Sequence, residues 1–140
     1  MRQILLFAAL AASLALLSGC TLSKTKKDTP EDMTGKAAYH KISAEEAYEM
    51  MSSQEVVVVD VRTRAEYDGG HIENAVLVPN ESIGSEMPGA LPDKEATLLI
   101  YCRSGRRSKD AAQKLLASGY QSVYDFGGVI DWPYELVKEG

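Results

Sequence analysis

The sequence has few cysteines, few histidines and no surplus of positive charge. Two cysteines and two histidines occur among 140 residues, and they do not stand at the spacing of metal ligands. We therefore expect no metal site and no resident cofactor. Acidic residues outnumber basic ones by 20 to 15, which gives a net charge of −5. Because nucleic-acid phosphates require a broad basic surface, we expect no nucleic-acid partner.

The chain has one long apolar run, at its N-terminus. Residues 1–20 read MRQILLFAALAASLALLSGC, with Arg2 before the run and small residues after it. The run is shorter than the roughly 20 apolar residues of a comfortable membrane span, and the pattern is typical of a secretory signal. Its ending, Leu-Ser-Gly-Cys, resembles a bacterial lipobox, in which Cys20 is lipidated and becomes the new N-terminus. The alternative is an ordinary signal peptide that is cut nearby, with Cys20 incidental.

These patterns divide the chain into three segments. We expect a lipoprotein signal peptide over 1–20, a flexible tether over 21–38 and one compact domain over 39–140, because the tether is polar and has no apolar period. The mature protein would be exported and lipid-anchored to the cell envelope, facing the periplasm or extracytoplasmic side. If Cys20 carries lipid, Cys102 has no partner for an internal disulfide. Cys102 is then a free thiol, either buried and inert or present for its chemistry.

Segments of strand and helix character alternate through the predicted domain. Runs of β-branched and aliphatic residues without polar alternation are typical of a parallel sheet that is covered on both faces. Apolar residues at helical spacing lie between them, and Ser43 with Glu46 forms a capping box. This order predicts an α/β fold with a central, mostly parallel sheet and helices on both faces. The predicted strands are 39–43, 55–62, 75–80, 96–102 and 122–126, and the predicted helical segments are 44–51, 63–70, 108–118 and 132–138, with a loop over 81–94.

The second cysteine stands at the end of a predicted strand. Ligands in open α/β sheets bind at the carboxyl ends of strands, and Cys102 has that position. In the turn that follows, Gly105 permits a positive φ, so that successive amides can converge on an anion. The next helix N-terminus and three arginines should favour the thiolate, which is the nucleophilic form. We therefore predict attack by Cys102 on a small anion; the alternative is a small hydrophobic core residue beside solvated arginines.

Three stretches resemble the rhodanese, or sulfurtransferase, family. They are DVRTRAEYDGGHIENAVLVP at 60–79, YCRSGRRS at 101–108 and FGGVIDWPYEL at 126–136. The resemblance covers about 39–140 and implies a single rhodanese-like domain. By this resemblance, Cys102 takes a sulfane sulfur from an anionic donor such as thiosulfate, releases sulfite, and passes the sulfur from a persulfide to cyanide or a thiol. The sequence departs from the family at Glu73-Asn74, where Gly or Pro-Gly is common, but that motif is structural.

The resemblance also implies roles for the residues around Cys102. Loop amides would cradle the persulfide, and arginine side chains would attract a dianionic donor. Asp60 and Arg62 flank a strand end near the site, where we favour a structural ion pair over a catalytic role. We expect His71 to anchor a loop and Trp132 to pack the last helix. The implied substrate- and persulfide-binding residues are Arg103, Ser104, Gly105, Arg106, Arg107 and Ser108.

Two other functions compete with sulfur transfer. A cysteine-dependent phosphatase of the related dual-specificity type would need an arginine after five intervening residues. That position is Ser108, so the loop is one residue too short for phosphate. The second competitor is a tethered persulfide carrier or a binding module that docks a partner at the envelope, which only the lipid anchor and tether favour.

Overall fold

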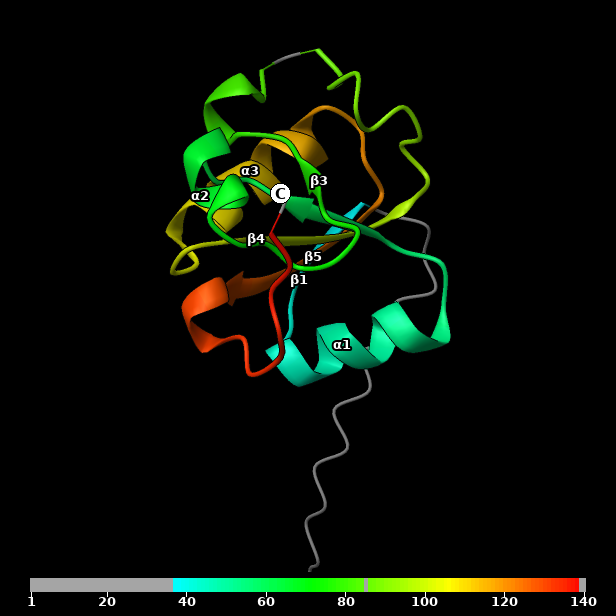
Figure 1. Cartoon of the computed structure of the whole chain (residues 1–140). Helices are drawn as coiled ribbons and strands as arrows, with labels where there is room; N and C mark the ends of the chain where they lie inside the picture. Colours follow the sequence, from blue (N-terminus) through cyan, green and yellow to red (C-terminus); the bar gives the residue numbers. More distant parts are fainter. Residues whose placement is uncertain (1–36, 85, 139–140) are drawn as a thin grey trace, which may run out of the picture. The chain divides into compact units, whose positions relative to one another are not determined.

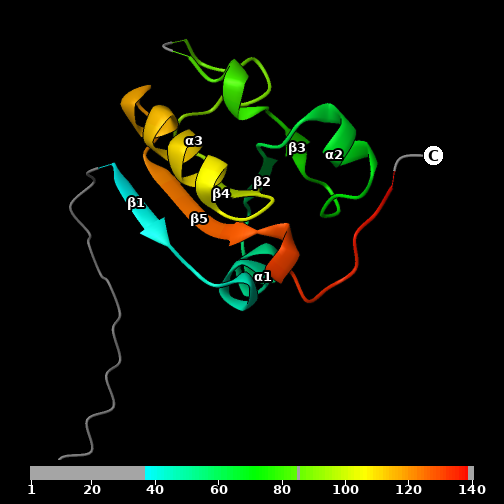
Figure 2. The same ribbon diagram turned by 90° about the vertical axis from the view of Figure 1, so that its left-hand side faces the viewer.

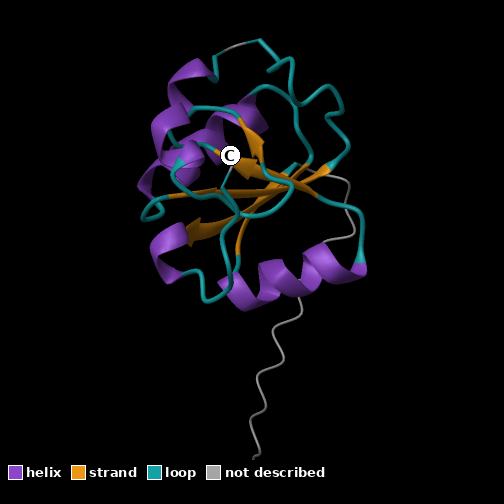
Figure 3. Ribbon diagram, in the orientation of Figure 1, coloured by secondary structure: helices purple, strands orange, loops and turns teal. Residues whose placement is uncertain are grey.

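The computed structural model describes residues 37–84 and 86–138, which contain a five-stranded sheet with helices on both faces (Figures 1 and 3). The predicted signal peptide, Cys20 and residues 21–36 of the predicted tether lie outside the described residues. The first strand begins at Ala38, one residue before the predicted start of the domain. Among the described residues, no helix has the length and apolar character needed to cross a bilayer.

The sheet is parallel throughout. Its strand order is β1-β5-β4-β2-β3, and each pair of neighbours runs in the same direction. The central strand is therefore β4, which ends at Cys102, and the carboxyl ends of all strands meet at one edge. This arrangement confirms the predicted fold class. The strands are β1 (Ala38–Lys41), β2 (Val57–Asp60), β3 (Val76–Leu77), β4 (Thr97–Cys102) and β5 (Ser122–Gly128).

Helices cover the two faces separately. One face carries α1 and the opposite face carries α3 (Figure 2). Along β4, Ile100 and Cys102 belong to the core beside α3, whereas Leu99 and Tyr101 belong to the core beside α1. Since side chains alternate across a strand, this register turns the Cys102 sulfur toward α3. The helices are α1 (Ala44–Ser53), α2 (Arg64–Asp68) and α3 (Arg106–Ala117), with 3₁₀ turns η1 (Asn80–Ser82) and η2 (Val129–Asp131).

Two helices begin with reciprocal capping boxes. At α1, the Ser43 hydroxyl accepts the Glu46 N–H at 3.1 Å, and the Glu46 carboxylate accepts the Ser43 N–H at 2.7 Å. This confirms the predicted cap. At α2, Thr63 and Glu66 form the same motif, which the sequence analysis missed. Each box satisfies donors that the first helical turn would leave unpaired.

The predicted strand over 75–80 is wrong in length and burial. Only Val76 and Leu77 pair with β2, and both are half-buried at the edge of the sheet. Hydrogen bonds to the β2 segment continue past Leu77, from the Val78 N–H to the Asp60 carbonyl at 2.9 Å and from the Asn80 N–H to the Val61 carbonyl at 3.1 Å. The strand itself ends because the 3₁₀ turn η1 begins at Asn80. The result is a short edge strand that leads into a 3₁₀ turn.

The predicted C-terminal helix over 132–138 is also wrong. Residues after η2 are not helical, and Val137 forms an antiparallel bridge with His71. The Val137 N–H donates to the His71 carbonyl at 2.8 Å, and the His71 N–H donates back at 2.9 Å. These bonds take the backbone groups of Val137 that a helix would need.

Candidate active site

The structure places Cys102 beneath the N-terminus of α3. Its sulfur accepts the Gly105 N–H at 3.0 Å, and the whole residue is 1% exposed. Gly105 has a φ of +97°, as the sequence predicted, and it is the residue immediately before α3. A residue with a β-carbon rarely adopts this angle. The loop can therefore wrap around the sulfur because a glycine stands at its turning point.

The environment of the sulfur favours the thiolate. Burial on its own raises the pKa of the Cys102 thiol, but hydrogen bonds outweigh burial and bring the pKa below its ordinary value. The backbone N–H groups of Ser108, Gly105 and Ser104 and the Ser108 hydroxyl act together in this direction. The sequence analysis gave much of this role to arginines. In the structure, groups that hydrogen-bond the sulfur directly contribute most of the stabilisation, and the charge of Arg107 also acts on Cys102.

The end of β5 forms the floor of the loop. Cys102 lies in register with Gly128, and the Ile130 N–H donates to the Arg103 carbonyl at 3.2 Å. A β-carbon on Gly128 would lie 2.6 Å from the Cα of Ser104 and closer still to the Arg103 oxygen. The loop can approach β5 this closely because Gly128 has no side chain. The FGG motif therefore has a steric function that sequence reasoning did not find.

Arg107 is engaged in an ion pair. Its guanidinium donates to both carboxylate oxygens of Glu66, each at 2.8 Å, and Glu66 at the same time caps α2. The contact with Arg107 is the main cause that lowers the pKa of Glu66 to about 2. Glu66 thus offsets the positive charge of Arg107, which the sequence analysis had assigned to attracting an anionic sulfur donor. Arg103 and Arg106 are exposed, and neither forms a salt bridge within the described part of the chain.

We expect the Glu66–Arg107 pair to make stability depend on pH. Because the pKa of Glu66 falls on folding from 4.5 to about 2, its contribution is present above pH 4.5 and is lost as the pH falls toward 2. Glu66→Gln should lose about 1 kcal/mol at pH 7, after allowance for solvent screening. Its free energy of unfolding, measured by urea titration, should also vary less than that of the wild type between these two pH values. The control is Glu46→Gln, which changes the equivalent capping residue of α1; an unaltered pH dependence in Glu66→Gln would contradict the prediction.

Asp60 and Arg62 form a buried ion pair at the end of β2, the strand next to β4. Arg62 Nη2 lies 2.6 Å from Asp60 Oδ2 and also donates to the Gly70 carbonyl at 2.8 Å. The Tyr101 hydroxyl donates to the same Asp60 oxygen at 2.7 Å. The pair thus ties the end of β2 to β4 and to the turn after α2. These contacts agree with the structural role that we favoured.

His71 and Trp132 both occupy structural positions. The His71 ring stacks on Tyr67 at 3.6 Å between centroids, and its Nδ1 lies 2.9 Å from the Tyr67 carbonyl oxygen. Since a carbonyl only accepts, Nδ1 carries the hydrogen, and His71 anchors its loop as expected. Trp132 packs on Phe126, with 5.5 Å between ring centroids, and on Tyr134, with 4.9 Å. Trp132 therefore packs an irregular C-terminal segment against Phe126, where the sequence analysis expected a helix.

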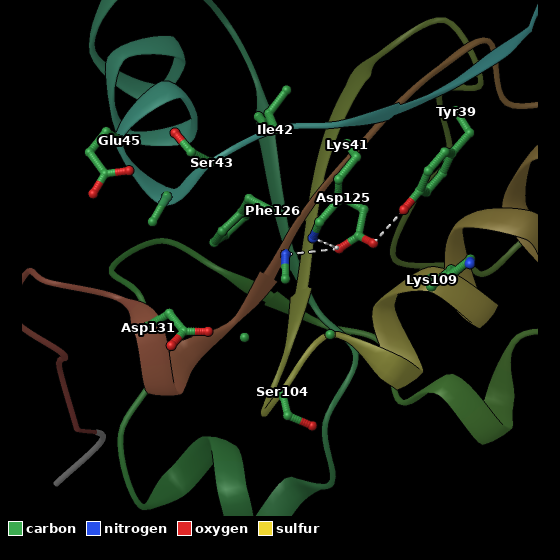
Figure 4. A pocket seen from close by; sticks show the side chains of 14 residues that line it. Tyr39, Lys41, Ile42, Ser43, Glu45, Ser104, Lys109, Asp125, Phe126 and Asp131 are labelled. Carbon is green, nitrogen blue, oxygen red and sulfur yellow. Dashed lines mark hydrogen bonds and ion pairs between the residues drawn. The ribbon is translucent and has the colours of Figure 1, made fainter.

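Asp125 is a site residue that the sequence analysis missed. It lies on β5, is 1% exposed, and accepts the Ser108 hydroxyl at 2.7 Å and the Gly127 N–H at 2.9 Å through Oδ1. Tyr39 and Lys41 of β1 reach it from an open cavity of about 790 Å³ (Figure 4). The only signal in the sequence was a single acid inside the apolar run SVYDF. The structure thus joins a buried carboxylate to the loop of Cys102.

The comparison with protein families identifies the domain. Residues 43–133 match the Rhodanese-like domain family. The chain belongs to the rhodanese family. The matched range includes the β4–α3 loop that holds Cys102.

Solved rhodanese structures resemble the chain over most of the domain. A rhodanese-like domain protein from Staphylococcus aureus is 32% identical with a TM-score of 0.62, covering 72% of this chain and 99% of that one. A human single-domain sulfurtransferase is 25% identical with a TM-score of 0.60, covering 66% of this chain and 93% of that one. An Escherichia coli rhodanese, solved with anions, is 32% identical with a TM-score of 0.55, covering 61% of this chain and 100% of that one.

Curated relatives are longer than this chain. A tRNA uridine(34) hydroxylase from Yersinia pestis is 31% identical over 106 residues, which is 72% of this chain. The chain spans about 30% of the length of that relative. The similarity therefore concerns one domain of a larger protein.

Proposed function

We propose that the chain is a sulfurtransferase that carries a sulfane sulfur on Cys102 as a persulfide. The observation that supports this most is the Cys102 sulfur at the N-terminus of α3, hydrogen-bonded by loop amides that lower its pKa. Such a setting supplies a thiolate nucleophile and stabilises an anionic product on the same atom. A small-anion donor such as thiosulfate and a thiol or cyanide acceptor fit this chemistry.

The proposed reaction has two displacements on sulfur. In the first, the Cys102 thiolate attacks the outer sulfur of thiosulfate; a new S–S bond forms, the old one breaks, and sulfite leaves with the electron pair. In the second, the acceptor attacks the outer sulfur of the persulfide, and Cys102 leaves as a thiolate. Arg103 and Arg106 are exposed beside the loop and supply positive charge for the donor. The Escherichia coli relative that was solved with anions supports this preference for anions.

Features of the loop disfavour phosphoryl transfer. Where a phosphatase needs arginine, this chain has Ser108, which is buried and hydrogen-bonded to Asp125. The preceding Arg107 is held by Glu66. The hydroxylase activity in the name of the Yersinia relative belongs to a protein of which this chain spans 30%, so it adds little for this chain.

Mass spectrometry of the full chain after treatment with thiosulfate tests the proposal. We expect a gain of one sulfur on Cys102, no gain in Cys102→Ser, and turnover of thiosulfate with cyanide. Hydrolysis of an aryl phosphate should be negligible. Failure of every sulfane donor to modify Cys102 would favour a binding module, and phosphatase activity that disappears in Cys102→Ser would favour the phosphatase. Loading without turnover would point to a persulfide carrier.

We also propose that the domain acts outside the cytoplasm on a lipid anchor at Cys20. The apolar run before Cys20 and the polar segment after it support this proposal. Labelling with a radioactive fatty acid in a bacterial host should mark the wild-type chain and spare Cys20→Ser. Equal labelling of both chains would contradict lipidation at Cys20.

A further inference from the structure

The Ser108 hydroxyl lies among more acceptors than it has hydrogens. Its oxygen lies 2.7 Å from Asp125 Oδ1, 3.0 Å from the Gly105 carbonyl, 3.4 Å from the Gly127 carbonyl and 3.8 Å from the Cys102 sulfur. Ser108 is completely buried. A hydroxyl group donates a single hydrogen, so only one of these acceptors receives it at a time.

Asp125 has the strongest hold on that hydrogen. Its carboxylate is charged and makes the shortest of the four contacts, and charge-assisted hydrogen bonds are roughly twice as strong as neutral ones. With the hydrogen on Asp125, the Ser108 oxygen presents lone pairs to the Cys102 sulfur. This arrangement suits a thiol, whose S–H can donate to Ser108. A thiolate gains the Ser108 hydroxyl as a donor only when that hydrogen leaves Asp125. Asp125 and the thiolate of Cys102 therefore compete for one hydrogen.

The groups around Asp125 hold the carboxylate in place and partly offset its charge. Oδ2 accepts the Tyr39 hydroxyl at 2.8 Å; burial and this hydrogen bond raise the pKa of Tyr39 to about 12, so it stays a donor at neutral pH. Lys41 Nζ lies 3.5 Å from Oδ1 but is 53% exposed, so solvent weakens its effect. The other charged groups that line the same cavity are Lys109 of α3, Glu45 of α1 and Asp131 of η2.

We propose that Asp125 is a positioning residue which, by holding the Ser108 hydroxyl, opposes the ionisation of Cys102 and offsets part of the effect of the loop amides. The effect of Asp125 on ionisation does not depend on the proposed function; only the benefit of that effect for sulfur transfer rests on it. A thiolate loses intrinsic nucleophilicity as its conjugate thiol becomes more acidic, and attack is best when ionisation lies near the ambient pH. If the loop amides acted alone, a larger fraction of Cys102 would be ionised, but the thiolate would be a weaker nucleophile. On ionisation, the S–H proton leaves to water and the sulfur keeps the electron pair.

The rate of Cys102 alkylation by iodoacetamide as a function of pH tests this inference. Asp125→Asn keeps an oxygen that can accept from Ser108 and Gly127, but it removes the charge. We expect the ionisation midpoint to fall by about one pH unit. Alkylation one unit below the wild-type midpoint should then speed up about twofold, because an about fivefold larger thiolate fraction is partly offset by an about threefold weaker nucleophile. The matched control is Asp131→Asn, which removes a carboxylate from the same cavity and should leave the midpoint unchanged. An unchanged or raised midpoint in Asp125→Asn would overturn the proposal.

Two further variants separate action through Ser108 from a simple effect of charge. In the Ser108→Ala background, Asp125→Asn should shift the midpoint by less than half as much, and an equal shift in both backgrounds would overturn the role of Ser108. Lys41→Gln changes an exposed side chain and should raise the midpoint by a few tenths of a unit; a lowered midpoint would count against the proposal.

Alkylation requires no sulfur donor. It therefore reports on Asp125 even if persulfide formation fails, and persulfide formation can succeed even if the midpoint does not move.

Discussion

Gly128→Ala is expected to slow both the alkylation and the sulfur loading of Cys102 about 100-fold, because displacement of the loop by about 1 Å misplaces the groups that act on the sulfur. The new β-carbon would lie 2.6 Å from the Cα of Ser104, and both Ser104 Cα and the nearby Arg103 carbonyl are backbone groups that cannot rotate away. The loop must therefore move off β5, and the Gly105 N–H would leave the sulfur. We expect a loss of about 2 kcal/mol in the free energy of unfolding from overpacking. Alkylation kinetics and urea titration measure the two effects.

The matched control for this variant is Gly89→Ala. Gly89 is exposed, and a β-carbon there would meet no atom of the described residues within 4 Å. It should leave stability and alkylation close to wild type. Since Gly128 has a φ of −121°, which any residue adopts, the predicted defect is steric. Wild-type alkylation in Gly128→Ala would show that the loop does not depend on this contact.

Arg62→Met is expected to cost about 3 kcal/mol of stability, because it leaves the Asp60 carboxylate buried without its cation. Asp60 is 0% exposed and Arg62 is 5% exposed, so water cannot replace the lost partner. The variant also removes the hydrogen bond to the Gly70 carbonyl, which holds the turn after α2. Thermal unfolding followed by circular dichroism should show a clearly lower Tm.

Arg64→Met provides the comparison for the buried pair. Arg64 pairs with Asp68 on α2 at 3.5 Å, but its side chain is 66% exposed. Exposed pairs of this kind contribute about 0.5 kcal/mol or less. If Arg62→Met and Arg64→Met lost similar amounts of stability, the buried Asp60–Arg62 pair would contribute no more than an exposed pair.

Local signals in the sequence predicted the fold class and placed Cys102 at the end of a buried strand. Runs such as ATLLIYC predicted a buried strand that ends at Cys102, and Gly105 predicted the positive φ of the loop. Ser43 with Glu46 predicted the start of α1. Each of these features depends on residues that are close together in the chain, so a pattern of residue types could predict it.

Contacts between residues far apart in the chain could not be predicted from local sequence patterns. Glu66 meets Arg107 across 41 positions and Ser108 meets Asp125 across 17, and no local pattern pairs them. The C-terminal segment was predicted as a helix because its bridge to His71 is likewise a long-range contact. Tertiary hydrogen bonds decided its conformation over local propensity.

The parallel pairing of β1 with β5 bears on the order in which the domain folds. Ala38 pairs with Ser122, so the first strand of the domain has no partner until the last strand is present. The same late strand contributes Gly128 under the loop and Asp125 beside Ser108. Pairing over such long separations carries a large loop-closure cost and is slow. We therefore expect the β5 groups that support the Cys102 loop, Gly128 and Asp125, to reach their places late in folding.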